Sequence, residues 1–172
     1  FIKVETNMLE NFQTACFMVQ DLKLDMMKKI RHIKTGFTSA GTAEEDLPNI
    51  YIVHGDLSDA EMNQLYNHSK VKAHISFTHG EGFGRPLLEA SMSEKPIIAP
   101  DWSGHIDFLS KQNSILLPGK LDGVPPHGFQ EGIWQEGMGW FNIDKGAAIG
   151  AMRDVRKNYR KWKLCAKKFP FQ

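Results

Sequence analysis

A strand, a glycine-rich turn, a helix and a second strand follow one another within residues 71–101, and this unit constrains the fold most strongly. The apolar run 73–78 meets three alternating glycines, helix-forming residues follow, and the apolar run 96–100 closes the unit. Glycine tolerates positive φ, and Pro86 suits the first helical position, where its missing N–H is not needed. The pattern predicts a turn that opens onto a helix N-terminus, an environment that attracts phosphate.

Two carboxylates flank this turn. Glu81 precedes its last two glycines, and Glu89 lies about one turn into the predicted helix. Open α/β sheets bind ligands at the carboxyl ends of their strands, so we expect both carboxylates to reach one crevice. Taken alone, Gly82 and Gly84 are weak evidence for a ligand, and a lone glutamate on a helix is most often solvated.

The order of these residues resembles the donor-site motif of retaining glycosyltransferases of family 4. The matching segments are residues 81–89, Glu-Gly-Phe-Gly-Arg-Pro-Leu-Leu-Glu, and residues 95–104, which begin Lys-Pro-Ile-Ile-Ala. The family has the GT-B fold of two facing Rossmann-like domains. The resemblance implies an α/β domain with a doubly wound, mostly parallel, three-layer sheet, which is one half of a GT-B fold. Alternating strands and helices along the chain favour the same class.

The resemblance also implies roles for individual residues. It gives Glu81 the catalytic position, in contact with the hydroxyls of the transferred sugar, and it gives Glu89 the ribose hydroxyls, which ionised acceptors bind well. Backbone N–H groups of Gly82, Phe83 and Gly84 would face the sugar and the diphosphate. The implied donor is a UDP-, GDP- or ADP-sugar, from which a hexose is transferred with retention to an unknown acceptor, without a metal or a cofactor.

A second turn, at residues 55–58, lies under the nucleotide base in the resembled family. This would place Gly55 and the backbone of Leu57 near the base, although a plain strand-to-helix connection explains these residues equally well. His79 stands directly before the motif and is suggestive of chemistry. A histidine at a strand end is nevertheless more often structural.

The family's Arg and Lys that clamp the diphosphate have no matching pattern in residues 1–70. We therefore expect the first strand of the domain to precede Phe1. A complete enzyme needs two domains, and 172 residues suffice for one. The expectation is a single donor-binding domain over residues 1–172, a fragment that lacks the N-terminal acceptor domain and is inactive alone. The alternative is a non-catalytic nucleotide- or sugar-binding module, or an interaction fragment.

Hydrophobic periodicity predicts the remaining elements. They are a helix over 1–12, a strand over 14–19, a helix from Asp21 that Gly36 ends, a strand over 49–54, a helix from a Ser58–Glu61 capping box through Tyr66, a helix over 106–109, a strand over 114–117, an irregular loop over 118–139 and a helix over 149–169.

Composition limits the classes of partner. A chain with 41% hydrophobic residues and a net charge of +1 can build a core and offers no global case for binding nucleic acid. No apolar run has the length of a membrane span and no signal-peptide pattern begins the chain, so a cytoplasmic location is expected. Cys16 and Cys165 lie far apart and are expected to be free thiols.

The predicted helix over residues 149–169 is amphipathic and strongly basic. A helix docked on the core with a solvated cationic face is the plainer interpretation. The alternative is contact with an anionic surface, which would make the protein peripheral to a membrane.

Overall fold

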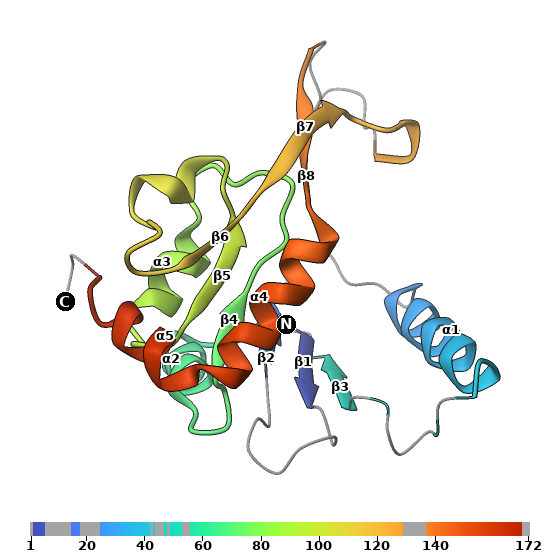
Figure 1. Ribbon diagram of the computed structural model, residues 1–172, viewed down its shortest axis with the longest axis horizontal. Coiled ribbons are helices and arrows are strands. Elements are labelled where there is room, and N and C mark those ends of the chain that lie inside the picture. Colours follow the sequence, from blue (N-terminus) through green and yellow to red (C-terminus); the bar gives the residue numbers. More distant parts are fainter. Residues whose placement is uncertain are drawn as a thin grey trace. The chain divides into compact units, whose positions relative to one another are not determined.

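The computed structural model describes residues 2–5, 15–17, 25–41, 43, 47, 49–52, 56–128 and 137–169. The chain divides into two compact units, residues 1–75 and 76–172 (Figure 1). The elements of the first unit are β1 (Ile2–Glu5), β2 (Ala15–Phe17), α1 (Asp25–Ser39), β3 (Asn49–Ile52), α2 (Asp59–Asn67) and β4 (Ala73–Ile75).

The strands of the first unit have the order β3-β1-β2-β4. β2 and β4 are parallel, as predicted, whereas β1 is antiparallel to both β2 and β3. The helix predicted over residues 1–12 is wrong where it can be compared, because residues 2–5 form β1. Ile2 and Val4 alternate with Lys3 and Glu5, a period of two that serves a strand better than a helix. Residues 6–12 lie outside the described residues.

In the first unit α2 begins as predicted, whereas α1 is described from Asp25 and ends later than predicted. α1 continues through Gly36 to Ser39, because one glycine weakens a helix without ending it, and Ala40 N–H still donates to the Gly36 carbonyl at 3.1 Å. The capping box of α2 is confirmed. Ser58 N–H donates to Glu61 Oε2 at 2.8 Å, and Glu61 N–H donates to Ser58 Oγ at 3.4 Å.

The second unit contains the remaining elements. They are α3 (Arg85–Ser91), β5 (Ile97–Pro100), the 3₁₀ helix η2 (Gly104–Asp107), β6 (Ile115–Leu117), β7 (Gly119–Gly123), the 3₁₀ helix η3 (Pro126–Gly128), β8 (Gly139–Ile143), α4 (Lys145–Lys157) and α5 (Tyr159–Ala166). The short helix predicted over 106–109 is thus the 3₁₀ helix η2, which begins two residues earlier.

β5 and β6 form a parallel pair in which Ile98 lies opposite Ile115. All four residues of β5 are buried, so both faces of this strand are covered. α3 and α4 both contact β5, and α4 also contacts β6. Helices packed on parallel strands are the arrangement of a Rossmann-like α/β domain, as predicted.

The loop predicted over residues 118–139 is largely wrong. β7 and β8 pair in antiparallel register, Gly119 opposite Ile143, and they extend away from β5 and β6 (Figure 1). Every residue of β7 is exposed, so its sequence carries no alternation of apolar and polar residues. Its strand conformation therefore depends on the partner strand. Residues 129–136 of this segment lie outside the described residues.

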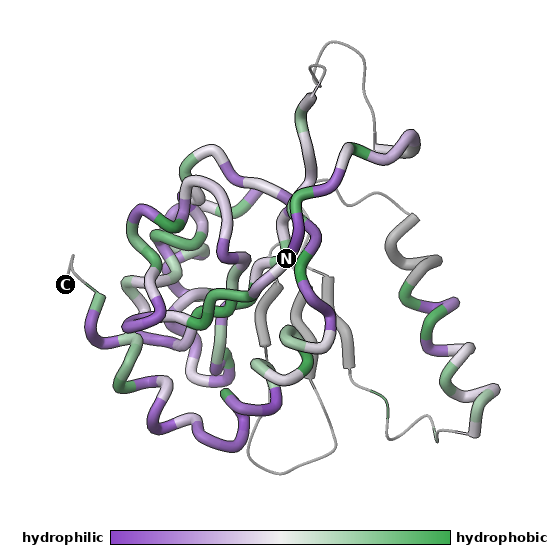
Figure 2. The backbone as a smooth tube through the Cα atoms, turned by 45° about the horizontal axis from the view of Figure 1, so that its top comes forward, coloured by the Kyte–Doolittle hydropathy of each residue, from purple (hydrophilic) through white to green (hydrophobic). Residues whose placement is uncertain are grey.

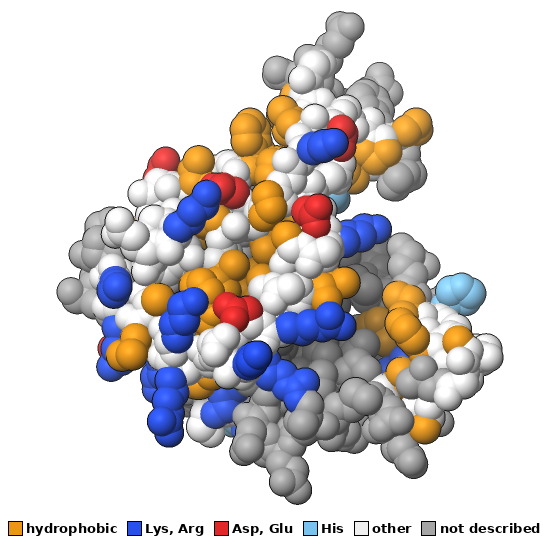
Figure 3. All heavy atoms as spheres, viewed as in Figure 1, with side chains coloured by type: hydrophobic (Ala, Val, Ile, Leu, Met, Phe, Trp, Pro, Cys, Tyr) orange, Lys and Arg blue, Asp and Glu red, His pale blue; other side chains and the backbone are white. Residues whose placement is uncertain are grey.

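The basic helix predicted over residues 149–169 is two helices, α4 and α5, separated at Asn158. Hydrophilic and apolar stretches alternate along both helices (Figure 2), and Lys and Arg gather over them on one face of the molecule (Figure 3). The apolar stripe expected to dock consists of Met152, Val155, Tyr159 and Trp162. Docking is confirmed for Val155, which is buried, and the other three are partly buried.

Asp154 joins α4 to α5 across the break. Asn158 Nδ2 and Trp162 Nε1 donate to its two carboxylate oxygens, each at 2.6 Å. These hydrogen bonds, that of Asn158 first, lower the pKa of Asp154 below its usual value, with smaller effects from Lys161 and Lys157. The ionised carboxylate therefore helps to fix the angle between the two helices.

We predict that Asp154→Ala destabilises the fold by about 1 kcal/mol at neutral pH, a small value because water reaches the carboxylate. A carboxyl group whose pKa is lowered on folding stabilises the fold above its unfolded pKa, and this contribution disappears as the pH falls through the lower folded value. The stability difference between Asp154→Ala and the unaltered protein should therefore shrink on acidification. Urea unfolding at a series of pH values measures it, and a difference independent of pH would contradict the prediction.

Candidate functional site

Two loops of the second unit hold the motif that the sequence singles out. One comprises residues 79–84 and leads into α3, and the other comprises residues 101–105 and follows β5. The chain enters the first loop beside β5, because Ser76 N–H donates to the Ile98 carbonyl at 3.0 Å. Both loops therefore leave from neighbouring strand positions.

Glu81 is held to the second loop by its backbone. Ser103 Oγ donates to the Glu81 carbonyl at 2.6 Å, and Glu81 N–H donates to Ser103 Oγ at 2.9 Å. Gly104 N–H also donates to the Glu81 carbonyl, at 3.1 Å. These bonds connect residues that are 22 positions apart and fix where the partly buried Glu81 side chain begins.

Close packing between the two loops requires glycine at two positions. A Cβ on Gly104 would overlap the carbonyl oxygen of Gly82. Gly84 has φ of 81°, and a Cβ there would lie 2.8 Å from the Cβ of His105. Gly84 is also the N-cap residue of α3, so the left-handed turn at this residue sets the direction in which α3 leaves the loop.

Ser103 adopts a strained backbone conformation, with φ of 80° and ψ of −171°. This region is populated almost entirely by glycine, and strain of this kind persists only where surrounding contacts enforce it. Here the enforcing contacts are the two hydrogen bonds of the Ser103 side chain to the backbone of Glu81. Such strain gathers at functional sites, so Ser103 makes this loop a candidate site.

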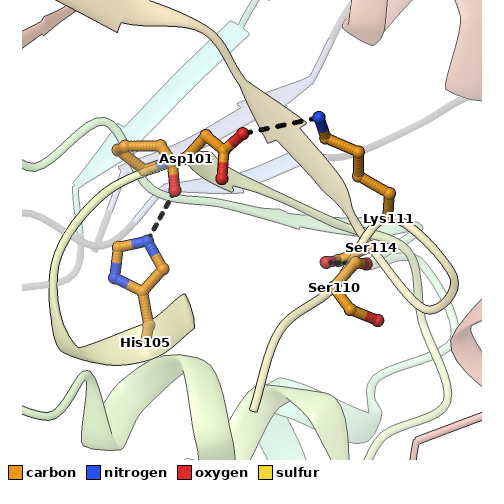
Figure 4. Close-up of polar contacts among 6 residues, drawn as sticks. Asp101, His105, Ser110, Lys111 and Ser114 are labelled. Atoms are coloured by element: carbon orange, nitrogen blue, oxygen red, sulfur yellow. Dashed lines mark hydrogen bonds and ion pairs between the residues drawn. The ribbon is translucent and has the colours of Figure 1, made fainter. Parts of the chain in front are cut away.

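His105 supports the second loop from below. Its side chain is wholly buried, and Nε2 donates to the Pro100 carbonyl at 2.7 Å (Figure 4). Nδ1 is buried and has no partner among the described residues. Figure 4 also shows Lys111, which pairs with Asp101 at 3.7 Å, and Ser114 Oγ, which donates to the Ser110 carbonyl at 2.8 Å. The Lys111–Asp101 ion pair is exposed and contributes little to stability.

Glu89 lies in α3 and accepts a hydrogen bond from Arg85 Nε at 2.7 Å. The side chain of Arg85 is 78% exposed and that of Glu89 is 29% exposed. Pairs of this kind, four residues apart on an exposed helix, stabilise by only about 0.2–0.5 kcal/mol. A ligand that offers better donors to Glu89 can therefore displace Arg85 at low cost.

Three consecutive N–H groups remain available in the first loop. Within the described part of the chain, the N–H groups of Gly82, Phe83 and Gly84 donate to no acceptor. Within α3, the N–H groups of Leu87 and Leu88 both donate to the Gly84 carbonyl. The three free groups are donors that an anionic ligand can use.

β8 braces both loops, which the sequence does not reveal. The rings of His79 and Trp140 stack with centroids 4.3 Å apart, and those of Trp102 and Phe141 stack at 5.9 Å. His79 Nδ1 also donates to the Phe141 carbonyl at 3.1 Å, and Phe141 N–H donates to the His79 carbonyl at 3.0 Å. His79 thus has a structural role, which was the plainer of its two interpretations.

The remaining candidates lie elsewhere. Leu57 is partly buried in the first unit, and Gly55 lies outside the described residues. Glu81, Gly82, Phe83 and Gly84 lie in the first loop and Glu89 lies in α3. Among the residues with described positions, no three His, Cys, Asp or Glu side chains are grouped to hold a metal ion.

We predict that Ser103→Ala is more destabilising than Ser103→Gly. Both changes remove two hydrogen bonds, a loss of about 2 kcal/mol, but only glycine also relieves the backbone strain, which recovers about 1 kcal/mol. Urea unfolding of the two variants measures the difference, with the exposed Ser69→Ala as a control. The opposite order, or two equal losses, would show that the backbone of Ser103 is not strained.

Comparison with known proteins adds one finding at these loops. None of the curated proteins compared with the chain matches it. Residues 39–119 match the family model of glycosyl transferases group 1, and this range includes both loops and α3. The match supports glycosyl transfer as the function of this part of the chain.

Proposed function

We propose that the chain is the donor-binding part of a retaining glycosyltransferase of family 4, with the GT-B fold, and that it transfers a hexose from a nucleotide-sugar to an acceptor. One observation carries the proposal. The backbone of Glu81 is fixed by Ser103 and Gly104, inside the segment that matches the group 1 family model and next to three N–H groups that have no acceptor among the described residues.

In this proposal the carboxylate of Glu81 binds hydroxyls of the transferred sugar. An ionised carboxylate accepts strong hydrogen bonds from hydroxyl groups. Its value for catalysis depends on its position, because small displacements of a positioning group reduce rates severely. The hydrogen bonds of Glu81 to the second loop supply this positional restraint.

The N–H groups of Gly82, Phe83 and Gly84 are proposed to bind the diphosphate. Negative charge builds on the diphosphate as the sugar departs, and fixed donors that face this charge stabilise the transition state. The resemblance to family 4 implies that the departing diphosphate itself takes part in the retaining mechanism and that no metal is needed. The carbonyl of Glu81 is occupied by Ser103 and Gly104, so it adds little repulsion there.

Glu89 is proposed to exchange its ion pair with Arg85 for the ribose hydroxyls. The exchange is inexpensive because Arg85 is mostly exposed. Once released, Arg85 is a cation adjacent in sequence to the free N–H groups and can contribute to diphosphate binding. We further propose that Gly55 and the backbone of Leu57 lie near the base, and that the reaction takes place in the cytoplasm.

A ribonucleoside diphosphate should stabilise the protein against heat more than its 2′-deoxy analogue does. UDP, GDP and ADP are tested first, and the base that raises the melting temperature most is then used. The 2′-deoxy analogue loses one hydrogen bond to the charged carboxylate of Glu89 and should therefore bind about tenfold more weakly. Glu89→Gln should reduce the difference between ribo and deoxy ligands. Glu94→Gln changes a partly exposed glutamate that follows α3 and pairs with Lys167, and it should preserve the difference.

In the same assay, Glu81→Gln distinguishes stabilisation by the sugar from stabilisation by the nucleotide. It should leave stabilisation by the plain nucleotide unchanged and reduce the additional stabilisation by the nucleotide-sugar, because the proposed contacts of Glu81 are to the sugar. Equal stabilisation of the unaltered protein by ribo and deoxy nucleotides would remove the role given to Glu89.

A further inference from the structure

α5 presents an exposed leucine surrounded by cations. Leu164 is 65% exposed. On a helix its surface neighbours are the residues three and four positions away, which are Arg160, Lys161, Lys167 and Lys168, all exposed. Although α5 ends at Ala166, Lys167 keeps helical backbone angles and Lys168 N–H donates to the Cys165 carbonyl, so the pattern continues through the last turn.

The charge of this region is strongly one-sided. Residues 153–168 contain eight Lys and Arg side chains and one acidic residue, Asp154, in a chain whose net charge is +1. The carboxylate of Asp154 is occupied by Asn158 and Trp162. Lys167 pairs with Glu94 at 3.1 Å, and both side chains are nearly half exposed. We call Arg160, Lys161, Leu164, Lys167 and Lys168 the basic face of α5.

The opposite side of the two helices is already docked. Val155, Ala166 and Phe169 are buried, and the ring of Phe169 packs edge-on against Phe108. Lys161 Nζ lies 4.7 Å from the ring centroid of the partly buried Trp162. Leu164 lies exposed among the cations of the basic face of α5.

We propose that the basic face of α5 binds an anionic lipid surface and inserts Leu164 at the boundary between headgroups and acyl chains. Cations attract the phosphates of anionic lipids, and an apolar side chain among them gains by leaving water. A nucleic acid also attracts the cations, but its phosphate backbone offers a central leucine no apolar environment. The contact is peripheral, and it is independent of the proposed donor site. Within the described ranges, no helix combines the length and apolar character that a membrane span requires.

Sedimentation of the whole chain with lipid vesicles tests the proposal. We expect binding to phosphatidylcholine vesicles that contain phosphatidylserine, weaker binding in high salt, and no binding to phosphatidylcholine alone. Leu164→Ser keeps the charge and should weaken binding severalfold. Each cation contributes about fivefold, so Lys161→Gln with Lys168→Gln should weaken binding at least tenfold.

Matched controls change the same residue types elsewhere. Leu121 is 52% exposed on β7, so Leu121→Ser removes an exposed leucine away from α5. Lys70→Gln with Lys120→Gln removes two exposed cations. Both controls should bind vesicles as the unaltered protein does. Binding that is insensitive to Leu164→Ser, equal binding to neutral vesicles, or tighter binding to a random oligonucleotide than to anionic vesicles would each overturn the proposal.

Discussion

The reciprocal hydrogen bonds between the Ser103 side chain and the Glu81 backbone are the contact on which the candidate site depends. They bring two loops together so closely that a Cβ on Gly104 would overlap the carbonyl oxygen of Gly82. The strained backbone of Ser103 is maintained by these same bonds. Gly84 lies three residues after Glu81 and is the N-cap residue of α3. The hydrogen bonds between Ser103 and Glu81 therefore also determine where Glu89 lies relative to Glu81 within this unit.

The elements that the sequence predicts well are those with strong local signals. The capping box at Ser58 and the buried strand at residues 97–100 both follow from short-range patterns, and the structure contains them. β7 was missed because its deciding contact is distant in sequence, since it is exposed throughout and pairs with β8. The break at Asn158 was missed for another reason: its side-chain bond to Asp154 spans only four residues and leaves the helical period intact. In β1 a four-residue alternation was outweighed by a longer apparent helical period.

The candidate site divides in the same way. The spacing of Glu81, the glycines and Glu89 is visible in the sequence, because one turn and one short helix hold all of it. The hydrogen bonds of Ser103 and the stacked rings of Trp140 and Phe141 are not visible in the sequence, because they join segments 22 to 62 residues apart and leave no periodic signal. A serine before a glycine in the second loop was the only hint, and its strained backbone becomes evident only in three dimensions.

Hydrogen exchange at the amides of Gly82, Phe83 and Gly84 tests the central claim most directly. These groups donate to no acceptor within the described part of the chain, so they should exchange rapidly in the free protein. The account predicts that a saturating nucleotide-sugar slows exchange at these three amides. Binding that leaves their exchange unchanged, with protection appearing only elsewhere in the chain, would contradict the proposed donor site.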